Sequence, residues 1–211
     1  MTSVNEINNR LLEYKKNYTL DNVPHGSLLS IKDKIIYNLI SEFANDVNSS
    51  KFREDMTINL AGYSNLEGKL GYDAMDGDRV VEVKPKNYIG KTKLSGQGNF
   101  TDFTHKRLQK YSNDNARMCV SGFYNGIIVC ILEFDFNEPT FIAQIKKLVC
   151  KRLPDGDKCG EYCRSASFGW NHYKNAESLK LKYLSPKLEE YKDGITGTFY
   201  KFLKGLPYIT Q

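Results

Sequence analysis

The sequence lacks any long hydrophobic run, and its apolar stretches all end well before the about 18 residues that a membrane-spanning helix needs. The N-terminus also lacks a signal-peptide core, because Glu6, Asn8 and Arg10 interrupt its apolar residues. Internal repeats and low-complexity tracts are missing as well. We therefore expect a cytoplasmic protein with no membrane partner, formed by one domain over residues 1–211. Its core should span about 30–150, followed by an irregular region and C-terminal helices.

Cysteine is scarce, and the five residues are an odd number in a chain without an export signal. This excludes a disulfide framework as the default and favours free thiols or metal ligands. Cys119 and Cys130 lie in strand-like runs and are interpreted as small core residues. The remaining cysteines and one histidine have the ligand types of a tetrahedral structural Zn²⁺ site: Cys150, Cys159, Cys163 and His172. Their spacing matches no familiar zinc motif, and Cys150 could instead end the apolar face of a helix.

Charge is unevenly distributed along the chain. The whole chain has a net charge of +5, whereas the segment from Lys84 to Arg117 has eight basic and two acidic residues and alone has +6. Such a local field suits a polyanionic partner such as DNA, although a solvated lysine-rich surface is an equally simple interpretation. Candidate DNA-binding residues from this segment are Lys86, Lys91, Lys93, Gln97, Asn99, Lys106 and Arg107.

Two features refine this hypothesis. The glycines of Ser95-Gly-Gln-Gly-Asn-Phe100 could let the backbone approach phosphates, and Gln97 and Asn99 could pair with adenine. A flexible connection explains the same residues nearly as well. Lys106 and Arg107 lie on or beside a predicted helix and could contact phosphates, or could form an ordinary polar helix face.

The hydrophobic pattern predicts helices and strands in a mixed order. Helical spacing predicts helices over residues 4–17, 31–44, 101–111, 141–150, 176–191 and 199–203. Strand-like runs predict strands over residues 56–61, 70–75, 79–84, 117–123 and 127–136, with turns at Asp76-Gly77 and Asn125-Gly126. This order indicates an α/β (α+β) fold with a central mixed sheet flanked by helices.

The segment from Gly71 to Lys86 contains the candidate catalytic residues. Side chains alternate along a strand, so Glu82 and Lys84 should share one face while Val81 and Val83 occupy the other. With Asp73 on the partner strand, two carboxylates and one ammonium group converge. Two adjacent carboxylates repel each other unless a cation lies between them, and a hard ion such as Mg²⁺ fits oxygen ligands. This ion would support phosphodiester hydrolysis, and Lys84 would orient water and stabilise the phosphate.

Asp73 followed after eight residues by Glu82-Val83-Lys84 resembles the PD-(D/E)XK motif of type II restriction endonucleases and DNA-repair nucleases. The resemblance extends to the order of elements from about Ser30 to Phe136. It implies a restriction-endonuclease-like core, Mg²⁺ ligands at Asp73 and Glu82, and a catalytic Lys84. It also implies a metal-ligating glutamate on the preceding helix, for which Glu42 is the candidate. Among restriction enzymes, a short chain implies a homodimer that cuts double-stranded DNA.

The sequence departs from the motif in two ways. Tyr72 replaces the proline, and Asp76 and Asp78 are alternative first carboxylates that lie closer to the turn. An exposed, salt-bridged hairpin would explain the same charges. Two other functions stay open: a structure-specific or repair nuclease, such as a junction resolvase or nicking enzyme, and a non-catalytic, zinc-stabilised DNA-binding module.

Overall fold

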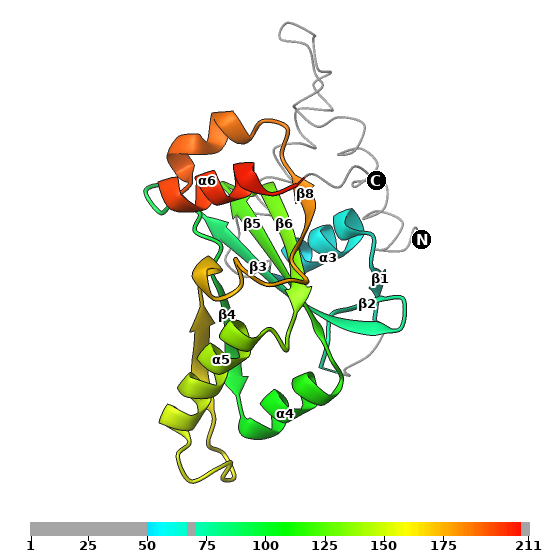
Figure 1. The fold of residues 1–211 in the computed structure, drawn as a ribbon, viewed down its shortest axis with the longest axis vertical. Coiled ribbons are helices and arrows are strands. Elements are labelled where there is room, and N and C mark those ends of the chain that lie inside the picture. The colour runs from blue at the N-terminus through cyan, green and yellow to red at the C-terminus, as the bar shows by residue number, and fades with distance from the viewer. Residues whose placement is uncertain (1–49, 67–70, 208–211) are drawn as a thin grey trace, which may run out of the picture.

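The computed structural model describes residues 50–66 and 71–207, and a six-stranded mixed sheet lies at its centre (Figure 1). The strands in spatial order are β1 (Ser64–Asn65), β2 (Ala74–Asp76), β3 (Arg79–Tyr88), β5 (Arg117–Tyr124), β6 (Ile127–Asp135) and β8 (Lys180–Leu184). Within this sheet β3 and β5 run parallel, and the other neighbouring strands run antiparallel. The predicted mixed sheet flanked by helices is confirmed. The helices predicted over 4–17 and 31–44 lie outside the described residues.

Two tight turns set the register of the sheet. Asn125 and Gly126 join β5 to β6 with φ angles of 47° and 75°, the left-handed conformation that a two-residue hairpin turn requires. Asp76 pairs with Arg79, so Gly77 and Asp78 form the turn between β2 and β3. This turn lies one residue later than predicted. Gly77 provides the positive φ of 59° that it needs.

Helix α3 (Ser50–Ala61) covers one face of the sheet. Its Met56, Ile58 and Ala61 pack in one buried cluster with Val81 and Val83 of β3. The strand predicted over residues 56–61 is therefore wrong. The alternation of apolar and polar residues suggested a strand, but the tertiary packing of the helix overrides this short local pattern.

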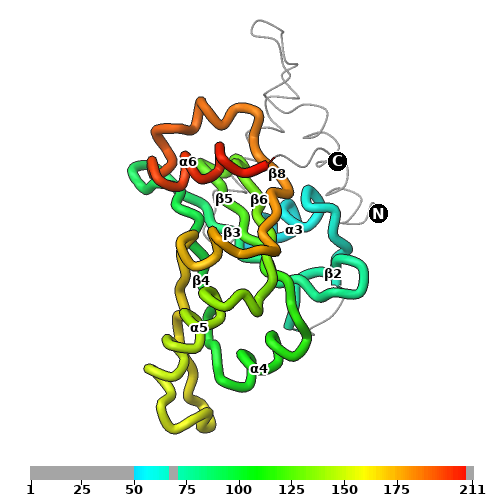
Figure 2. The backbone as a smooth tube through the Cα atoms, in the orientation of Figure 1, coloured from blue at the N-terminus to red at the C-terminus, as the bar shows by residue number. Residues whose placement is uncertain are grey.

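The other face of the sheet is covered by α4 (His105–Asn113), α5 (Pro139–Arg152), α6 (Gly197–Gly205) and a small sheet of β4 (Gly98–Phe103) and β7 (Cys163–Phe168). Figure 2 follows the chain out of β3 into β4, which lies beside α5, and on into α4. Aromatic rings dominate this second core, including Phe100, Phe136, Phe141 and Phe168.

Two predicted helices on this side need correction. In the 101–111 segment the strand β4 continues to Phe103, and the helix begins only after Thr104, whose hydroxyl accepts a hydrogen bond from the Arg107 amide at 3.1 Å. The segment 176–191 contains β8 and part of a 3₁₀ helix, η2 (Leu188–Gly194). Alternating lysine and apolar residues favour the strand, and Pro186 prevents a continuous helix.

The helix predicted over residues 141–150 is present as α5, and the one over 199–203 as α6. All five cysteines are free thiols, and Cys119 and Cys130 are buried, as predicted. No helix within residues 50–66 and 71–207 has the length and apolar character to span a membrane.

Replacing Phe141 by alanine is expected to lower the free energy of unfolding by about 3–5 kcal/mol, because the fully buried ring contacts four other rings, those of Phe100, Phe134, Phe136 and Phe168. Urea unfolding followed by circular dichroism measures the change. The control is Ile89→Ala, at a side chain that is 49% exposed, which should change the free energy by less than about 0.5 kcal/mol. Equal losses in both variants would contradict the aromatic core.

Candidate active site

The β2–β3 hairpin holds Asp73 against the strand that carries Glu82 and Lys84. Asp73 lies one residue before β2, and its amide donates to the Val81 carbonyl at 3.1 Å. In return, its carboxylate oxygen Oδ2 accepts a hydrogen bond from the Val83 amide at 2.8 Å. These two bonds fix the Asp73 side chain beside the segment from Val81 to Val83. The hairpin therefore brings the first predicted carboxylate to the second.

Glu82 is almost completely buried, with 3% of its surface exposed. Its oxygen Oε1 accepts a hydrogen bond from the Lys84 ammonium group, and its Oε2 accepts one from the Tyr111 hydroxyl at 2.6 Å. The neighbouring Val81 and Val83 pack on the opposite face beneath α3. The predicted alternation of charged and apolar side chains along β3 is confirmed.

Lys84 lies at the boundary between the core and the surface. Its side chain is 19% exposed, compared with 4% for that of Glu82. The ammonium group lies 5.2 Å from the centre of the Phe100 ring, which contributes a cation–π contact from β4. The lysine is thus held by one carboxylate and one ring, while part of it still reaches solvent.

The electrostatics of the site show that its carboxylates repel one another. Burial and the negative charge of Glu82 raise the pKa of Asp73, against the opposing effect of Lys84. Burial and the charge of Asp73 also raise the pKa of Glu54, which lies on α3. The positive charges of Lys84 and Lys51 therefore do not offset the burial of these carboxylates and the repulsion between them. A bound cation would relieve this repulsion.

Glu54 is the acidic residue that the sequence reasoning missed. Glu42, the predicted helix glutamate, lies outside the described residues. The structure instead places Glu54 near Asp73 from the helix that immediately precedes the hairpin. The strand predicted over residues 56–61 hid this arrangement. The spacing of Lys51 and Asp55, which form an i,i+4 ion pair at 2.9 Å, is a helical signal that could have revealed it.

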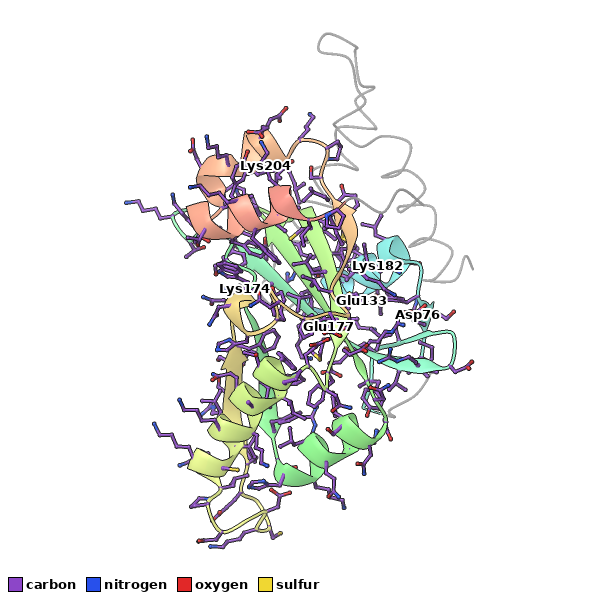
Figure 3. The ribbon with its side chains drawn as sticks, in the orientation of Figure 1. Asp76, Glu133, Lys174, Glu177, Lys182 and Lys204 are labelled. Atoms are coloured by element: carbon purple, nitrogen blue, oxygen red, sulfur yellow. The ribbon has the colours of Figure 1, made fainter. Side chains whose placement is uncertain are left out.

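The alternative first carboxylates have other roles. Asp76 forms an ion pair with Arg117, which also binds Glu133 at 2.7 Å. Glu133 lies under α3, where it also accepts a hydrogen bond from Tyr63, and Figure 3 shows it with Asp76 and Lys182 around it. Asp78 is exposed in the turn. The geometry therefore favours Asp73 over both.

The donor atoms at this hairpin fit Mg²⁺. Among the described residues, no three His, Cys, Asp or Glu side chains are grouped closely enough to hold a metal ion by themselves. Mg²⁺ does not need such a group, because proteins usually hold it with one or two carboxylates while water and substrate phosphates complete its shell. Asp73 and Glu82 provide two such carboxylates. Burial and the negative charge of Glu82 raise the pKa of Asp73, and a bound cation would oppose this effect.

The candidate zinc ligands do not come together. Cys163 begins β7 and His172 follows its far end, so the strand alone separates them by about 17 Å. The imidazole of His172 instead hydrogen-bonds with Gly169 and contacts Asn171. Cys150 and Cys159 are exposed. These four residues, all within the described part of the chain, form no common metal site.

In the basic segment from Lys84 to Arg117, some candidate DNA-binding side chains are exposed and others are held by hydrogen bonds. Exposed side chains on β3, the β3–β4 loop and the start of α4 include Lys86, Lys91, Lys93, Gln97 and Lys106. Arg107 is held more tightly, because its guanidinium donates to the Thr101 carbonyl at 3.1 Å and to the Tyr111 hydroxyl at 3.2 Å. Asn99 is half-buried, and its side-chain oxygen accepts hydrogen bonds from Ser165 and Ser167.

The glycines near Asn99 serve packing. A Cβ atom on Gly96 would lie 2.5 Å from the Phe199 ring, and one on Gly98 would lie 2.2 Å from the Phe168 ring. Both glycines are buried, and the Gly96 carbonyl accepts a hydrogen bond from Tyr173 at 2.7 Å. Packing against these rings therefore accounts for both glycines, and the approach of a phosphate to their backbone stays a prediction.

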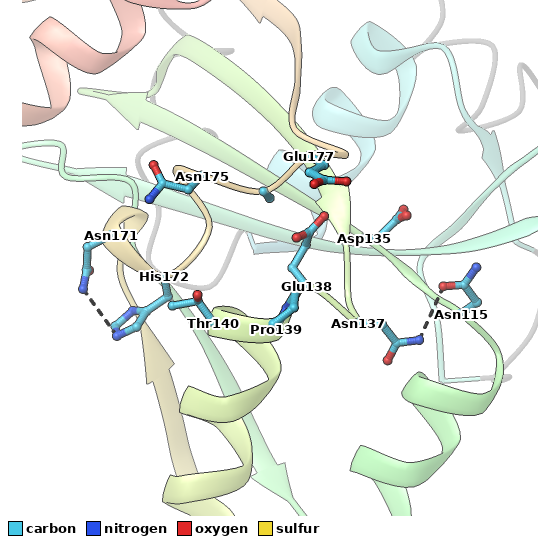
Figure 4. Close-up of a pocket in the computed structure, with 11 residues that line it drawn as sticks. Asn115, Asp135, Asn137, Glu138, Pro139, Thr140, Asn171, His172, Asn175 and Glu177 are labelled. Atoms are coloured by element: carbon cyan, nitrogen blue, oxygen red, sulfur yellow. Dashed lines mark hydrogen bonds between the residues drawn. The ribbon is translucent and has the colours of Figure 1, made fainter.

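A cavity of about 510 Å³ lies apart from this site, between Asn115, the start of α5 and residues 171–177 (Figure 4). Its lining includes the carboxylates of Asp135, Glu138 and Glu177 but no lysine or arginine. Asp73, Glu82 and Lys84 do not line it. The negative lining would repel phosphates, so this cavity is unsuited to nucleic acid.

Replacing Asp73 by asparagine is expected to raise the stability of the protein at pH 7, by on the order of 1 kcal/mol, because repulsion from Glu82 is lost while an acceptor for the Val83 amide remains. Because the folded-state pKa of Asp73 is raised, the gain is full only at pH values above that pKa. It should disappear as the pH falls through that raised pKa toward the unfolded value of about 3.9.

Urea unfolding in the presence of a chelator, from pH 4 to pH 8, measures this difference. The control is Asp55→Asn, on the outer side of α3, where an ion pair with Lys51 is removed instead. A destabilised Asp73→Asn at pH 7, or a gain that does not change with pH, would contradict the repulsion.

Comparison with known proteins adds no relative on which to base an assignment: no protein-family model matches the chain, and no curated protein does so either. The hairpin, its three neighbouring carboxylates and its lysine must therefore be interpreted from their own chemistry.

Proposed function

We propose that the chain is a Mg²⁺-dependent DNA endonuclease that hydrolyses phosphodiester bonds. The observation that carries this proposal is the convergence of Asp73, Glu82 and Lys84 on one hairpin, with Glu54 approaching from α3. Carboxylates that repel each other beside a partly exposed lysine suit a metal-assisted reaction on a phosphate. The basic segment that follows suits a polyanionic substrate.

Each residue has a distinct role in this proposal. Asp73 and Glu82 would hold Mg²⁺, and Glu54 is a carboxylate of α3 beside them. The bound ion would lower the pKa of a water molecule and neutralise charge on the phosphate. The Lys84 ammonium group would orient the attacking water and donate a hydrogen bond to a phosphate oxygen in the transition state.

The wider architecture agrees with the resemblance to type II restriction enzymes. In that family the motif lies on strands of a mixed sheet between helices. Here β3 carries Glu82 and Lys84 and lies between antiparallel β2 and parallel β5. The protein would therefore have a restriction-endonuclease-like core and would act as a homodimer on double-stranded DNA. A dimer places two such sites on the two strands of a duplex.

The ribbon of β4 and β7 is the candidate for base recognition. Its inner residues Phe100 and Ala166 are buried, whereas Thr101, Ser165 and Ser167 face solvent. Uncharged hydrogen-bonding groups on a two-stranded ribbon can enter the major groove and read base edges. This supports a sequence-specific enzyme over a structure-specific or repair nuclease. A zinc-stabilised binding module is less well supported, because its candidate ligands lie apart.

Replacing Lys84 by alanine is expected to lower the rate of DNA cleavage by at least about 10²-fold, because transition-state stabilisation is lost, while DNA binding changes little. Cleavage of plasmid DNA with and without Mg²⁺ measures the rate, and a gel-shift assay measures binding. The control is Lys201→Ala, an exposed lysine on α6. Full cleavage by Lys84→Ala, or no Mg²⁺-dependent cleavage by the unchanged protein, would refute the proposal.

The pattern of products distinguishes the nucleases. Discrete bands whose sequenced ends share one motif indicate a restriction enzyme, whereas cuts only at branches, or smears, indicate the structure-specific alternative.

Replacing Glu54 by glutamine is expected to raise the Mg²⁺ concentration for half-maximal cleavage by about tenfold, because one carboxylate near the ion loses its charge. The measurement is a Mg²⁺ titration of the cleavage rate. The control Asp55→Asn removes a carboxylate at the next position of the same helix, which pairs with Lys51, and should leave the titration unchanged. Identical titrations for Glu54→Gln and the unchanged protein would remove Glu54 from the site.

A further inference from the structure

Tyr111 is a fully buried residue of α4 whose hydroxyl reaches the candidate site. The hydroxyl oxygen lies 2.6 Å from Oε2 of Glu82, 2.9 Å from the Gly71 carbonyl oxygen and 3.2 Å from Nη2 of Arg107. The ring is 1% exposed. A tyrosine hydroxyl keeps its proton at neutral pH, so this group can donate a hydrogen bond.

The phenol has one proton and two acceptors within reach. The Glu82 carboxylate is charged and closer than the Gly71 carbonyl, so it takes the stronger hydrogen bond. Gly71 lies two residues before Asp73, in the segment that leads into the hairpin. One hydroxyl thus contacts the two chain segments that carry the carboxylates Asp73 and Glu82.

The position of the hydroxyl is itself fixed. Arg107 lies one helical turn before Tyr111 on α4, and its guanidinium donates to both the Tyr111 oxygen and the Thr101 carbonyl. The Tyr111 ring packs between those of Phe103 and Phe136, with centroid distances of 5.5 and 5.3 Å. Close packing on both sides leaves the ring one orientation.

We propose that Tyr111 is a positioning residue that fixes Oε2 of Glu82, so that the Glu82 carboxylate and the Lys84 ammonium group are presented together to the metal ion and the phosphate. The proposal rests on the proposed nuclease function. Groups that hydrogen-bond a metal-ligating carboxylate orient it, and their loss weakens metal binding. Each Glu82 oxygen has one donor, Lys84 or Tyr111, and retains a lone pair for a cation.

Tyr72 offers a matched control. It is also buried, and its ring lies 4.8 Å from that of Tyr111. Its hydroxyl donates to Asp114 at 2.8 Å, away from Glu82. Tyr111→Phe and Tyr72→Phe each remove one buried hydroxyl that binds a carboxylate, so they differ in which carboxylate loses its donor.

The test is a Mg²⁺ titration of the full chain with two readouts, the rate of plasmid cleavage and the rise in melting temperature that Mg²⁺ causes. Tyr111→Phe should raise the half-saturating Mg²⁺ concentration by about 10- to 100-fold in both readouts, with a smaller effect on the rate at saturating Mg²⁺. Tyr72→Phe should keep both within about twofold. Arg107→Gln removes the donor to Tyr111 and should shift both readouts in the same direction by a smaller factor.

Two outcomes separate this proposal from the one it rests on. A Tyr111→Phe protein that titrates like the unchanged protein, or like Tyr72→Phe, overturns the role of Tyr111 while the nuclease stands. An unchanged protein that neither cuts DNA nor gains stability with Mg²⁺ overturns the nuclease itself. Should Tyr111→Phe not fold, a titration of Arg107→Gln identical to that of the unchanged protein also overturns the proposal.

Discussion

The burial of the Glu82 carboxylate is the constraint on which the candidate site depends. A charged group removed from water is costly unless hydrogen bonds and an opposite charge replace its hydration. Here the replacements come from two directions, Lys84 on the same strand and Tyr111 on α4. The hydrogen bond from Tyr111 to this carboxylate therefore links α4 to β3, and Phe100 of β4 completes the surroundings of the lysine.

The sheet buries a second carboxylate on its opposite face, and the two carboxylates differ in how their charge is balanced. Glu133 is 2% exposed, but it receives a guanidinium from Arg117 and a hydroxyl from Tyr63, with Lys180 and Lys182 within 4 Å. On that face, the basic side chains balance the negative charges of Glu133 and Asp76. Around Glu82, burial and the repulsion between neighbouring carboxylates raise the pKa values of Asp73 and Glu54, despite the positive charges of Lys84 and Lys51.

The sequence predicted the structure correctly where the local residue pattern and the packing in the folded protein favour the same conformation. Asn125-Gly126 predicts its turn because few residues adopt the left-handed backbone, and the alternation from Val81 to Lys84 predicts which side chains share a face. It was misleading over residues 56–61, where a period of two suggested a strand but packing on β3 makes a helix. Tyr111 could not be found this way, because its role arises from a contact with Glu82, which belongs to a distant segment of the chain.

The parallel arrangement of β3 and β5 has a consequence for how the site assembles. Antiparallel neighbours can be joined by a two-residue turn, but parallel ones need an excursion of the chain, here residues 89–116. Both Phe100 and Tyr111 belong to that excursion. The hairpin with its acids can therefore form early from neighbouring residues, whereas the ordered charge arrangement is completed only when the longer loop closes. Folding should accordingly make the candidate site one of the last parts of the sheet to form.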